Sequence, residues 1–308
     1  MRWRSLGLVW APNPKYYWQQ SHATLATPLI INQDVVRVYL YCRDAQNIGR
    51  IGFIDVSASN PLRVLYSSER PVLDIGDPGA FDDHGVVPVS VVSLSNKTIL
   101  LYYNGFELCH GIPYRILTGL ARSDDGGRSF SKISQAPIMD RSDSELYFRC
   151  GNCVLFEEGM ETFKNWYIAG SSWRELNGKC VPVYNMHYSE SRGGIEWASA
   201  GSPSLTINPA TEHGFSRPSI IRDQSGSFEM FYSIRSLARG YIMGYATSDN
   251  GLDWIRRDSE LQFVPSGRGW DSDTQCYPAI VSVGGQRYMF YNGNNYGEYG
   301  LSVAIEEA

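Results

Sequence analysis

Long apolar runs are missing from this chain of 308 residues. No uncharged apolar stretch approaches the roughly 18 residues that a membrane-spanning helix requires. Arg2 and Arg4 are followed only by the short stretch 6–10 before Pro12, whereas a secretory leader needs an apolar stretch of roughly 7–15 residues. The sequence therefore predicts a cytoplasmic protein with no membrane partner.

Clusters of one charge sign are missing as well. Lys and Arg number 27 against 32 Asp and Glu, which gives a net charge of −5, and no Lys/Arg-rich run occurs. Because nucleic acids are bound chiefly through basic patches, this composition excludes a nucleic-acid partner. The chain also carries no P-loop, dinucleotide fingerprint or nucleophile elbow. We therefore expect a protein that works without a cofactor.

Cysteine provides no complete metal site. Cys150 and Cys153 form a CxxC pair, but neither a second CxxC nor a paired-His motif accompanies it, and a structural zinc ion needs four ligands. No loop with dense, regularly spaced Asp residues demands a Ca²⁺ ion. The sequence predicts buried thiols and identifies no metal-binding residues, while a Ca²⁺ ion at the centre of the fold stays open as an alternative.

Aromatic residues and glycine are plentiful. Tyr, Trp and Phe make up 13% of the chain, and there are 30 Gly. This composition favours strands and tight turns over helices. Aromatic rings also suit sugar binding, because the apolar face of a pyranose packs on a flat ring while its hydroxyls hydrogen-bond at the edge.

A repeat of about 60 residues runs through the whole chain. Pro28, Pro88, Pro218 and Pro278 are each followed by aliphatic, β-rich segments, and the segment 152–156 supplies a fifth copy without its Pro. An alternating second strand follows each marker, at 36–43, 98–104, 165–171, 227–235 and 286–292. A third strand follows at 49–56, 116–123, 183–189, 241–248 and 300–305, and then a less regular fourth.

Four strands repeated at this period indicate a β-propeller rather than a sandwich. The last copy stops after its third strand, and the spare N-terminal strand 3–10 can complete it and remove an open sheet edge. We predict an all-β fold, a five-bladed propeller with four-stranded antiparallel blades, in which residues 1–308 form one domain. The turns 123–130 and 247–254 share a Ser/Thr-x-Asp-x-Gly pattern that is typical of strand connections.

Polar residues recur where each first strand begins, which in a propeller places them around one mouth of the central channel. The carboxylates among them are candidate catalytic residues: Asp82, Asp83, Glu145, Glu212 and Asp273. Candidate substrate-binding residues come from the same segments and from the ends of the second strands. They are His22, Arg43, Asp44, His84, Arg149, Trp173, His213, Arg217, Arg235, Trp270, Asp271, Tyr277 and Asn292.

This constellation resembles the five-bladed propeller glycoside hydrolases of families 43, 32 and 130, over almost the entire chain. The resemblance implies two carboxyl groups flanking a glycosidic bond, one as general acid and the other as base or nucleophile. Asp82 or Asp83 corresponds to the acidic residue of the second blade and Glu145 to that of the third. Thr27 stands where family 43 carries Asp. Another carboxylate (Asp44, Asp271 or Asp273) therefore activates water, or the nucleophile is not water.

Three functions are compatible with these residues. The leading one is cleavage or transfer of a glycosidic bond in a central pocket that Asp83, Glu145, Glu212 and Asp273 share. The second is phosphorolysis or glycosyl transfer, with phosphate or a nucleotide sugar held by an anion site, since guanidinium groups bind phosphate oxygens bidentately. Its residues are Arg43, Arg149, Arg217, Arg235, His84, His213 and Tyr277. The third is a sugar-binding propeller without catalysis.

Overall fold

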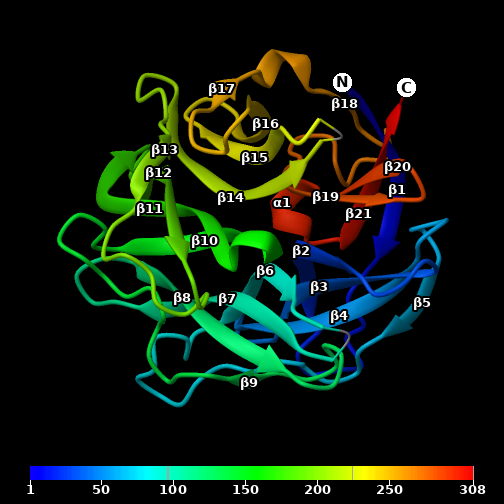
Figure 1. Ribbon diagram of the computed structural model, residues 1–308, viewed down its shortest axis with the longest axis horizontal. Coiled ribbons are helices and arrows are strands. Elements are labelled where there is room, and N and C mark those ends of the chain that lie inside the picture. Colours follow the sequence, from blue (N-terminus) through cyan, green and yellow to red (C-terminus); the bar gives the residue numbers. More distant parts are fainter. Residues whose placement is uncertain (96, 224, 308) are drawn as a thin grey trace.

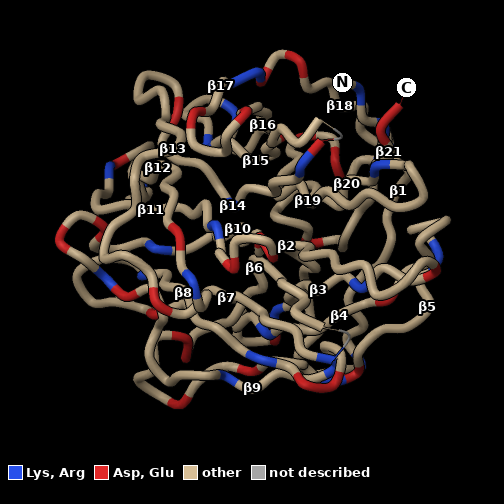
Figure 2. Tube along the Cα trace, viewed as in Figure 1, with Lys and Arg blue, Asp and Glu red and all other residues tan. Residues whose placement is uncertain are grey.

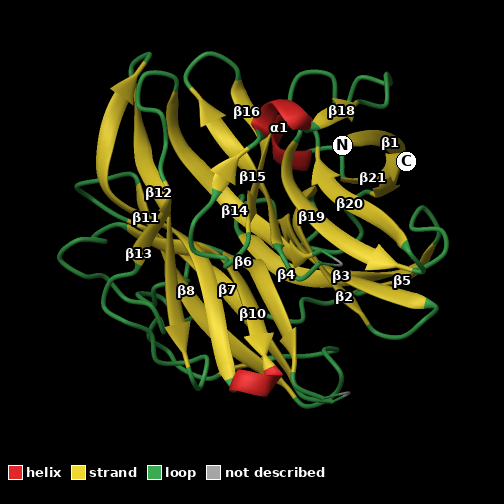
Figure 3. Ribbon diagram, turned by 45° about the horizontal axis from the view of Figure 1, so that its top comes forward, coloured by secondary structure: helices red, strands yellow, loops and turns green. Residues whose placement is uncertain are grey.

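The computed structural model describes residues 1–95, 97–223 and 225–307, and strands make up nearly all of its regular structure (Figure 3). Its helical elements are the short α1 (Asn294–Gly297) and the 3-10 turns η1 (Glu158–Met160) and η2 (Asp258–Glu260). The predicted all-β fold is confirmed. None of the helices in the described residues is both long and apolar enough to cross a membrane.

The strands form successive antiparallel groups that follow the predicted repeat. The first group is β2 (Ser21–Ile30), β3 (Val35–Arg43), β4 (Gly49–Ser57) and β5 (Val64–Ser67); the second is β6 (Val86–Ser93), β7 (Ile99–Leu108), β8 (Tyr114–Ser123) and β9 (Ser131–Lys132). The third is β10 (Phe148–Glu157), β11 (Thr162–Leu176), β12 (Lys179–Ser191) and β13 (Ser202–Leu205). The fourth is β14 (Glu212–Arg222), β15 (Phe228–Ser236), β16 (Gly240–Ser248) and β17 (Ile255–Arg256).

The last group joins the two ends of the chain. It consists of β19 (Cys276–Val283), β20 (Gln286–Asn292), β21 (Leu301–Glu307) and the N-terminal strand β1 (Arg2–Trp10), with β18 (Gln262–Val264) at its edge. β1 runs antiparallel to β21, with Trp3 opposite Glu306. The prediction that the N-terminal strand completes the last sheet is confirmed.

The groups are arranged radially, and the chain passes from one to the next around a common centre (Figure 1). The first strands β2, β6, β10, β14 and β19 lie closest to that centre, and the N- and C-termini lie next to each other (Figure 1). Basic and acidic positions are interspersed around the rim (Figure 2).

The hydrophobic core lies between neighbouring groups. Second strands contribute large rings that are fully buried, among them Tyr103 and Tyr232. Between the fourth and last groups, the rings of Trp3 and Phe231 meet edge to face with centroids 5.9 Å apart. Burying such a side chain contributes roughly 1.5–3 kcal/mol, so each interface between groups stabilises both of its members.

The turn motif predicted at 123–130 is present. The Asp125 carboxylate accepts the backbone N–H groups of Arg128 and Ser129, and Gly127 has φ +78°. In the related turn 247–254 the predicted pattern assigns this role to Asp249. The structure gives it to Asn250 instead, whose side-chain oxygen accepts the N–H groups of Leu252 and Asp253, because the residue directly before Gly251 points back into the turn.

Replacing Trp3 tests the closure of the last group. Trp3→Ala removes a completely buried ring, and such truncations cost about 3–5 kcal/mol. We expect a loss of that size in the free energy of unfolding, measured by urea denaturation. Ile255→Ala, at a side chain that is 61% exposed, is the control and should change the free energy of unfolding little. An equal effect of both substitutions would contradict the closure.

Candidate functional site

A pocket opens at the centre of the molecule, where strands of all the groups converge. Aromatic and aliphatic side chains make up most of its wall, and the polar groups are few. It is lined by Leu25, Val87, Val89, Asn104, Phe106, Ile116, Cys150, Gly151, Ile168, Tyr184, Phe215, Ser216, Arg217, Tyr241 and Tyr277. A few polar groups in an apolar, aromatic wall are typical of the lining of a small-molecule site, but the cavity volume of about 90 Å³ is below the roughly 300–1,000 Å³ of such sites.

A second pocket adjoins the central one, since Val87 and Phe106 line both. The remaining residues of this second pocket come from the first and second groups. They are Tyr41, Arg43, Asn47, Gly49, His84, Gly85, Leu108 and Tyr114. Together the two pockets contain the predicted residues Arg43, His84, Arg217 and Tyr277.

Tyrosine rings dominate the polar part of the central pocket. The rings of Tyr241 and Tyr277 lie 5.5 Å apart, and Tyr296 of α1 meets Tyr241 edge to face at 5.4 Å. Arg235 lies against this cluster, with its guanidinium 5.3 Å from the ring centres of both Tyr184 and Tyr241 and hydrogen-bonded to the Tyr184 hydroxyl. The arrangement presents flat aromatic faces and hydroxyl groups together.

None of the residues lining either pocket in the described part of the chain is Asp or Glu. The residues just before the five sequence markers also carry no carboxylate: Thr27, Val87, Gly151, Arg217 and Tyr277. The sequence predicts that Asp83, Glu145, Glu212 and Asp273 share one depression, but none of these four residues lines either pocket.

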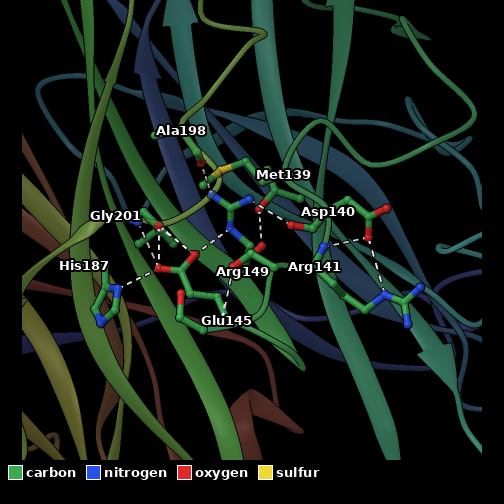
Figure 4. Close-up of polar contacts among 12 residues, drawn as sticks. Met139, Asp140, Arg141, Glu145, Arg149, His187, Ala198 and Gly201 are labelled. Carbon is green, nitrogen blue, oxygen red and sulfur yellow. Dashed lines mark hydrogen bonds and ion pairs between the residues drawn. The ribbon is translucent and has the colours of Figure 1, made fainter.

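Glu145 lies inside the third group, where it is fully buried (Figure 4). Its carboxylate is 2.7 Å from Arg149 Nε and 2.7 Å from His187 Nδ1, and it accepts the Tyr167 hydroxyl at 2.9 Å and the Gly201 N–H at 3.1 Å (Figure 4). Burial alone would raise the pKa of Glu145, but the hydrogen bonds and the Arg149 charge outweigh it and hold the pKa below its usual value.

The same lock recurs in other groups. Asp82 accepts the Tyr103 hydroxyl at 3.0 Å and lies 2.6 Å from Lys132 Nζ. Asp271 accepts the Tyr291 hydroxyl at 2.6 Å. In each case a buried acid before the first strand is bound by a Tyr of the second strand, 20 to 22 positions later.

The fourth group uses a variant of this lock. Arg256 binds both carboxylate oxygens of Glu212, at 3.0 and 2.7 Å, and also Asp258, which accepts the Tyr232 hydroxyl at 2.7 Å.

Asp44 is likewise occupied, because Arg50 lies 2.5 Å from its carboxylate and the N–H groups of residues 46 and 48 bind it. The matched positions of these acids thus reflect the folding repeat.

Asp83 is the predicted catalytic carboxylate that stays close to the pockets. Its Oδ1 lies 2.5 Å from Nδ1 of His84, whose side chain is 43% exposed and lines the second pocket. Burial opposes ionisation of Asp83, but hydrogen bonds from His84 and from the Gly79 N–H lower its pKa below the usual value. Asp83 is therefore ionised at neutral pH and orients the His84 ring.

The remaining predicted residues fall into separate places. His22, near Arg43, has its pKa lowered to about 4 by burial and by the Arg43 charge, so it is neutral at pH 7. His213 is buried against the Pro182 carbonyl, and burial lowers its pKa. Trp173 packs on Tyr114, a residue of the second pocket, at 5.2 Å.

Trp270 and Asp273 line a separate pocket of about 560 Å³ beside α1, together with Asn294 and Tyr299. Asn292 bridges two groups: its side chain accepts the N–H of Leu25 at 3.1 Å and donates to the Ala23 carbonyl at 2.6 Å. Trp270, Asp273 and Asn292 are not among the described residues that line the central pocket.

Tyr184, Tyr241, Phe106, Tyr114 and Asn104 line the pockets but are not among the sequence candidates. A signal for part of this set exists in the sequence, because Tyr114 and Tyr241 both lie at the beginning of a third strand. The sequence candidates come from the beginnings of first strands and the ends of second strands, so aromatics at the beginning of a third strand fall outside them.

The described residues contain no group of three or more His, Cys, Asp or Glu side chains that could hold a metal ion. The six cysteines are free thiols. The prediction of buried thiols holds for Cys42, Cys150 and Cys276, whereas Cys109 and Cys153 are half-buried and Cys180 is exposed. The Cys153 sulfur accepts the Ile220 N–H at 3.4 Å.

Glycoside hydrolases are among the solved structures with this arrangement. A glycoside hydrolase superposes with a TM-score of 0.72 at 16% identity, covering 99% of this chain and 91% of its own. A complex of BT0996 with RGII gives a TM-score of 0.70 at 16% identity, with the same coverages of 99% and 91%. A thermostable family-43 glycoside hydrolase gives 0.66 at 18%, covering 96% and 92%. The protein thus has the propeller-type fold of these enzymes, and the resemblance expected from the sequence is confirmed at that level.

Sequence comparison places the protein in a family. Two uncharacterized proteins of Mycobacterium tuberculosis, MT1551 and Rv1502, are each 31% identical to it over 307 residues, which is 100% of this chain and 100% of theirs. The chain belongs to the same family as these two proteins. No protein-family model matches it.

Glu145→Gln tests the structural role of the buried lock. The substitution leaves Arg149 without its counter-charge, and breaking a buried ion pair costs about 3–5 kcal/mol. The lowered pKa of Glu145 means that this stabilisation is present above the pKa of the unfolded state, about 4.3, and is lost as the pH falls below it. We expect urea denaturation to show a large difference between wild type and variant at pH 7 and a smaller one at pH 3.5.

The matched control is Asp124→Asn, which removes an exposed carboxylate paired with Arg122 and should leave the unfolding midpoint almost unchanged. A Glu145→Gln protein as stable as wild type at pH 7 would show that the lock is dispensable for folding and return Glu145 to the catalytic candidates.

Proposed function

We propose that the protein is a glycoside-hydrolase-like, carbohydrate-active protein that binds a saccharide in its central pocket and cleaves or transfers a glycosidic bond there. The observation that carries the proposal is the tyrosine-rich pocket at the convergence of the first strands, in a fold shared with glycoside hydrolases. We interpret the strand groups as the blades of one five-bladed propeller spanning residues 1–308, located in the cytoplasm.

The pocket wall matches the surface of a sugar ring. Tyr184, Tyr241 and Tyr277 offer flat faces for the apolar side of a pyranose, and their hydroxyls, with the amide of Asn104, can bond the ring hydroxyls at its edge. That a structural neighbour is a complex of BT0996 with RGII supports a saccharide as the ligand.

Proton transfer in this proposal falls to Asp83 and His84. Asp83 holds Nδ1 of the His84 ring, so the opposite nitrogen, Nε2, is left to exchange a proton with the leaving oxygen or with an attacking water. The other acids proposed from the sequence are less suited to this role, because Asp82, Glu145, Glu212 and Asp271 are held by the Tyr and cation partners described above.

Because those acids are already bound by tyrosine hydroxyls and cations, a second candidate is also favoured: a sugar-binding propeller without catalysis. A pair of carboxyl groups flanking the bond is the usual requirement for glycoside hydrolysis. The polar groups in the described lining of the central pocket are instead tyrosine hydroxyls, the Asn104 amide, the Ser216 hydroxyl, the Cys150 thiol and the Arg217 guanidinium. The same pocket would then recognise a glycan and leave it intact.

Substitution of the pair distinguishes the two candidates. General acid–base catalysis contributes about 10²–10⁴-fold to a rate, so Asp83→Asn and His84→Gln should each reduce turnover by at least about 100-fold. Product release from a panel of aryl glycosides and mixed oligosaccharides is measured by mass spectrometry, and thermal unfolding is followed in parallel. Asp77→Asn, an exposed carboxylate in the same loop, is the matched control and should keep full activity.

Full activity of both Asp83→Asn and His84→Gln would rule out the pair as the catalytic groups. Saccharide binding without product in the wild-type protein would establish the binding-only candidate. Absence of both binding and turnover across the panel would refute the proposed function itself.

A further inference from the structure

Buried arginines in this chain are normally neutralised by a carboxylate. In the described residues the fully buried arginines are Arg37, Arg149 and Arg217. Arg37 makes two hydrogen bonds to Asp55, at 2.8 and 2.9 Å, and Arg149 lies 2.7 Å from Glu145. Arg217 is different, because its described partners are all neutral.

The contacts of Arg217 are also long. It donates to Thr27 Oγ1 at 3.2 Å, to the Pro278 carbonyl at 3.3 Å and to the Val89 carbonyl at 3.4 Å. Its Nε–H has no hydrogen-bond partner among the residues that the structure describes, although only 5% of Arg217 is exposed. The side chain lines the central pocket. A buried guanidinium with an unused donor is costly unless something else satisfies it.

Arg235 repeats part of this situation beside Tyr184 and Tyr241. Its guanidinium packs against both rings and bonds the Tyr184 hydroxyl, and its Nε–H also has no partner in the described part of the chain. Burial would lower the pKa of Arg235, but the neighbouring tyrosine hydroxyls raise it, so the group is a cation. Arg217 thus lines the pocket, and Arg235 lies behind the Tyr184 and Tyr241 rings of its wall.

The titratable groups around these arginines supply no negative charge at neutral pH. Burial lowers the pKa of Arg217 to about 10, which leaves it protonated. Burial raises the pKa of the Cys150 thiol to about 12 and that of Cys153 to about 11. The pKa values of Tyr241 and Tyr277 are raised by burial too, that of Tyr241 to about 12. Each of these thiol and phenol groups is therefore neutral.

We propose that the central pocket is specific for a saccharide that carries an anionic group, a carboxylate or a phosphate, which Arg217 and Arg235 bind while the tyrosine rings hold the sugar. This inference rests on the proposed function and names its ligand class. Guanidinium groups match the paired oxygens of both anions, and in both arginines the Nε–H donor is buried and unpaired among the described residues. Other buried arginines are neutralised by a carboxylate of the protein itself. For Arg217 and Arg235, the ligand supplies the negative charge.

Calorimetric titration of the full chain with matched probes tests the inference. The pairs are glucuronate against glucose and galacturonate against galactose, with glucose 1-phosphate and inorganic phosphate as phosphate arms. We expect the anionic member of at least one series to bind at least about tenfold more tightly than its neutral partner. A preference for the uronates identifies a carboxylate ligand, and a preference for glucose 1-phosphate identifies a phosphate ligand.

Arg217→Met and Arg235→Met should each abolish this preference, reducing affinity for the anionic probe by at least about tenfold while leaving that for the neutral sugar within about twofold. Arg217→Lys keeps the charge and should restore part of the preference. Arg122→Gln, a surface arginine paired with Asp124, is the control and should behave as wild type.

Thermal unfolding separates a ligand-binding role from a structural one. Arg149→Met strands the Glu145 carboxylate and should lower the unfolding temperature, whereas Arg217→Met strands no charge and should leave it unchanged or higher. Equal affinity for neutral and anionic sugars would overturn the anion specificity but not saccharide binding. A large fall in unfolding temperature for Arg217→Met, without any loss of anion preference, would show that Arg217 serves only to fill the hub.

Discussion

The central pocket depends on hydrogen bonds that connect neighbouring strand groups at three of their junctions. At the hub, a polar side chain on a second strand accepts a backbone N–H from the first strand of the following group: Asn104 from Gly151, Ser233 from Tyr277, and Asn292 from Leu25. The donor residues sit at strand irregularities with positive φ, 61°, 53° and 57° respectively. A non-Gly residue such as Tyr277 adopts this conformation only where its surroundings compel it, and this hydrogen bond is what holds it there.

A second set of contacts acts within the strand groups. The acids Asp82, Glu145 and Asp271 accept hydroxyls from second-strand tyrosines and so fix the loop that enters the first strand. Because these carboxylates are buried, they need several donors to remain stable, and satisfying them removes them from the solvent-filled centre. The repeated acidic residues consequently stabilise the fold, whereas aromatic and cationic side chains lie at the central pocket.

The site follows from this division. Rings of Tyr184, Tyr241 and Tyr277 surround a pocket bordered by Arg217 and, behind the rings, by Arg235. Thr27 lies in hydrogen-bonding reach of Arg217, at the position where the family 43 resemblance implies an acid. The protein shares the architecture of glycoside hydrolases while presenting a differently charged centre. The shared fold therefore does not by itself identify the ligand.

The amino-acid sequence by itself determined the strands, their repeat and the closing role of the N-terminal segment, because alternating burial and turn chemistry act over a few neighbouring residues and leave a periodic record. It also placed Arg217 and Tyr277 near the centre through their position before a marker Pro. Only the tertiary structure decided which polar residues face the pocket. Glu145 and Asp83 look alike in sequence, yet one meets Arg149, His187 and Tyr167 while the other meets His84 beside a pocket. Arg149 and His84 are close to these acids in the chain, but Tyr167 and His187 lie 22 and 42 positions from Glu145, on β11 and β12, and local pattern carries no information about such distant partners.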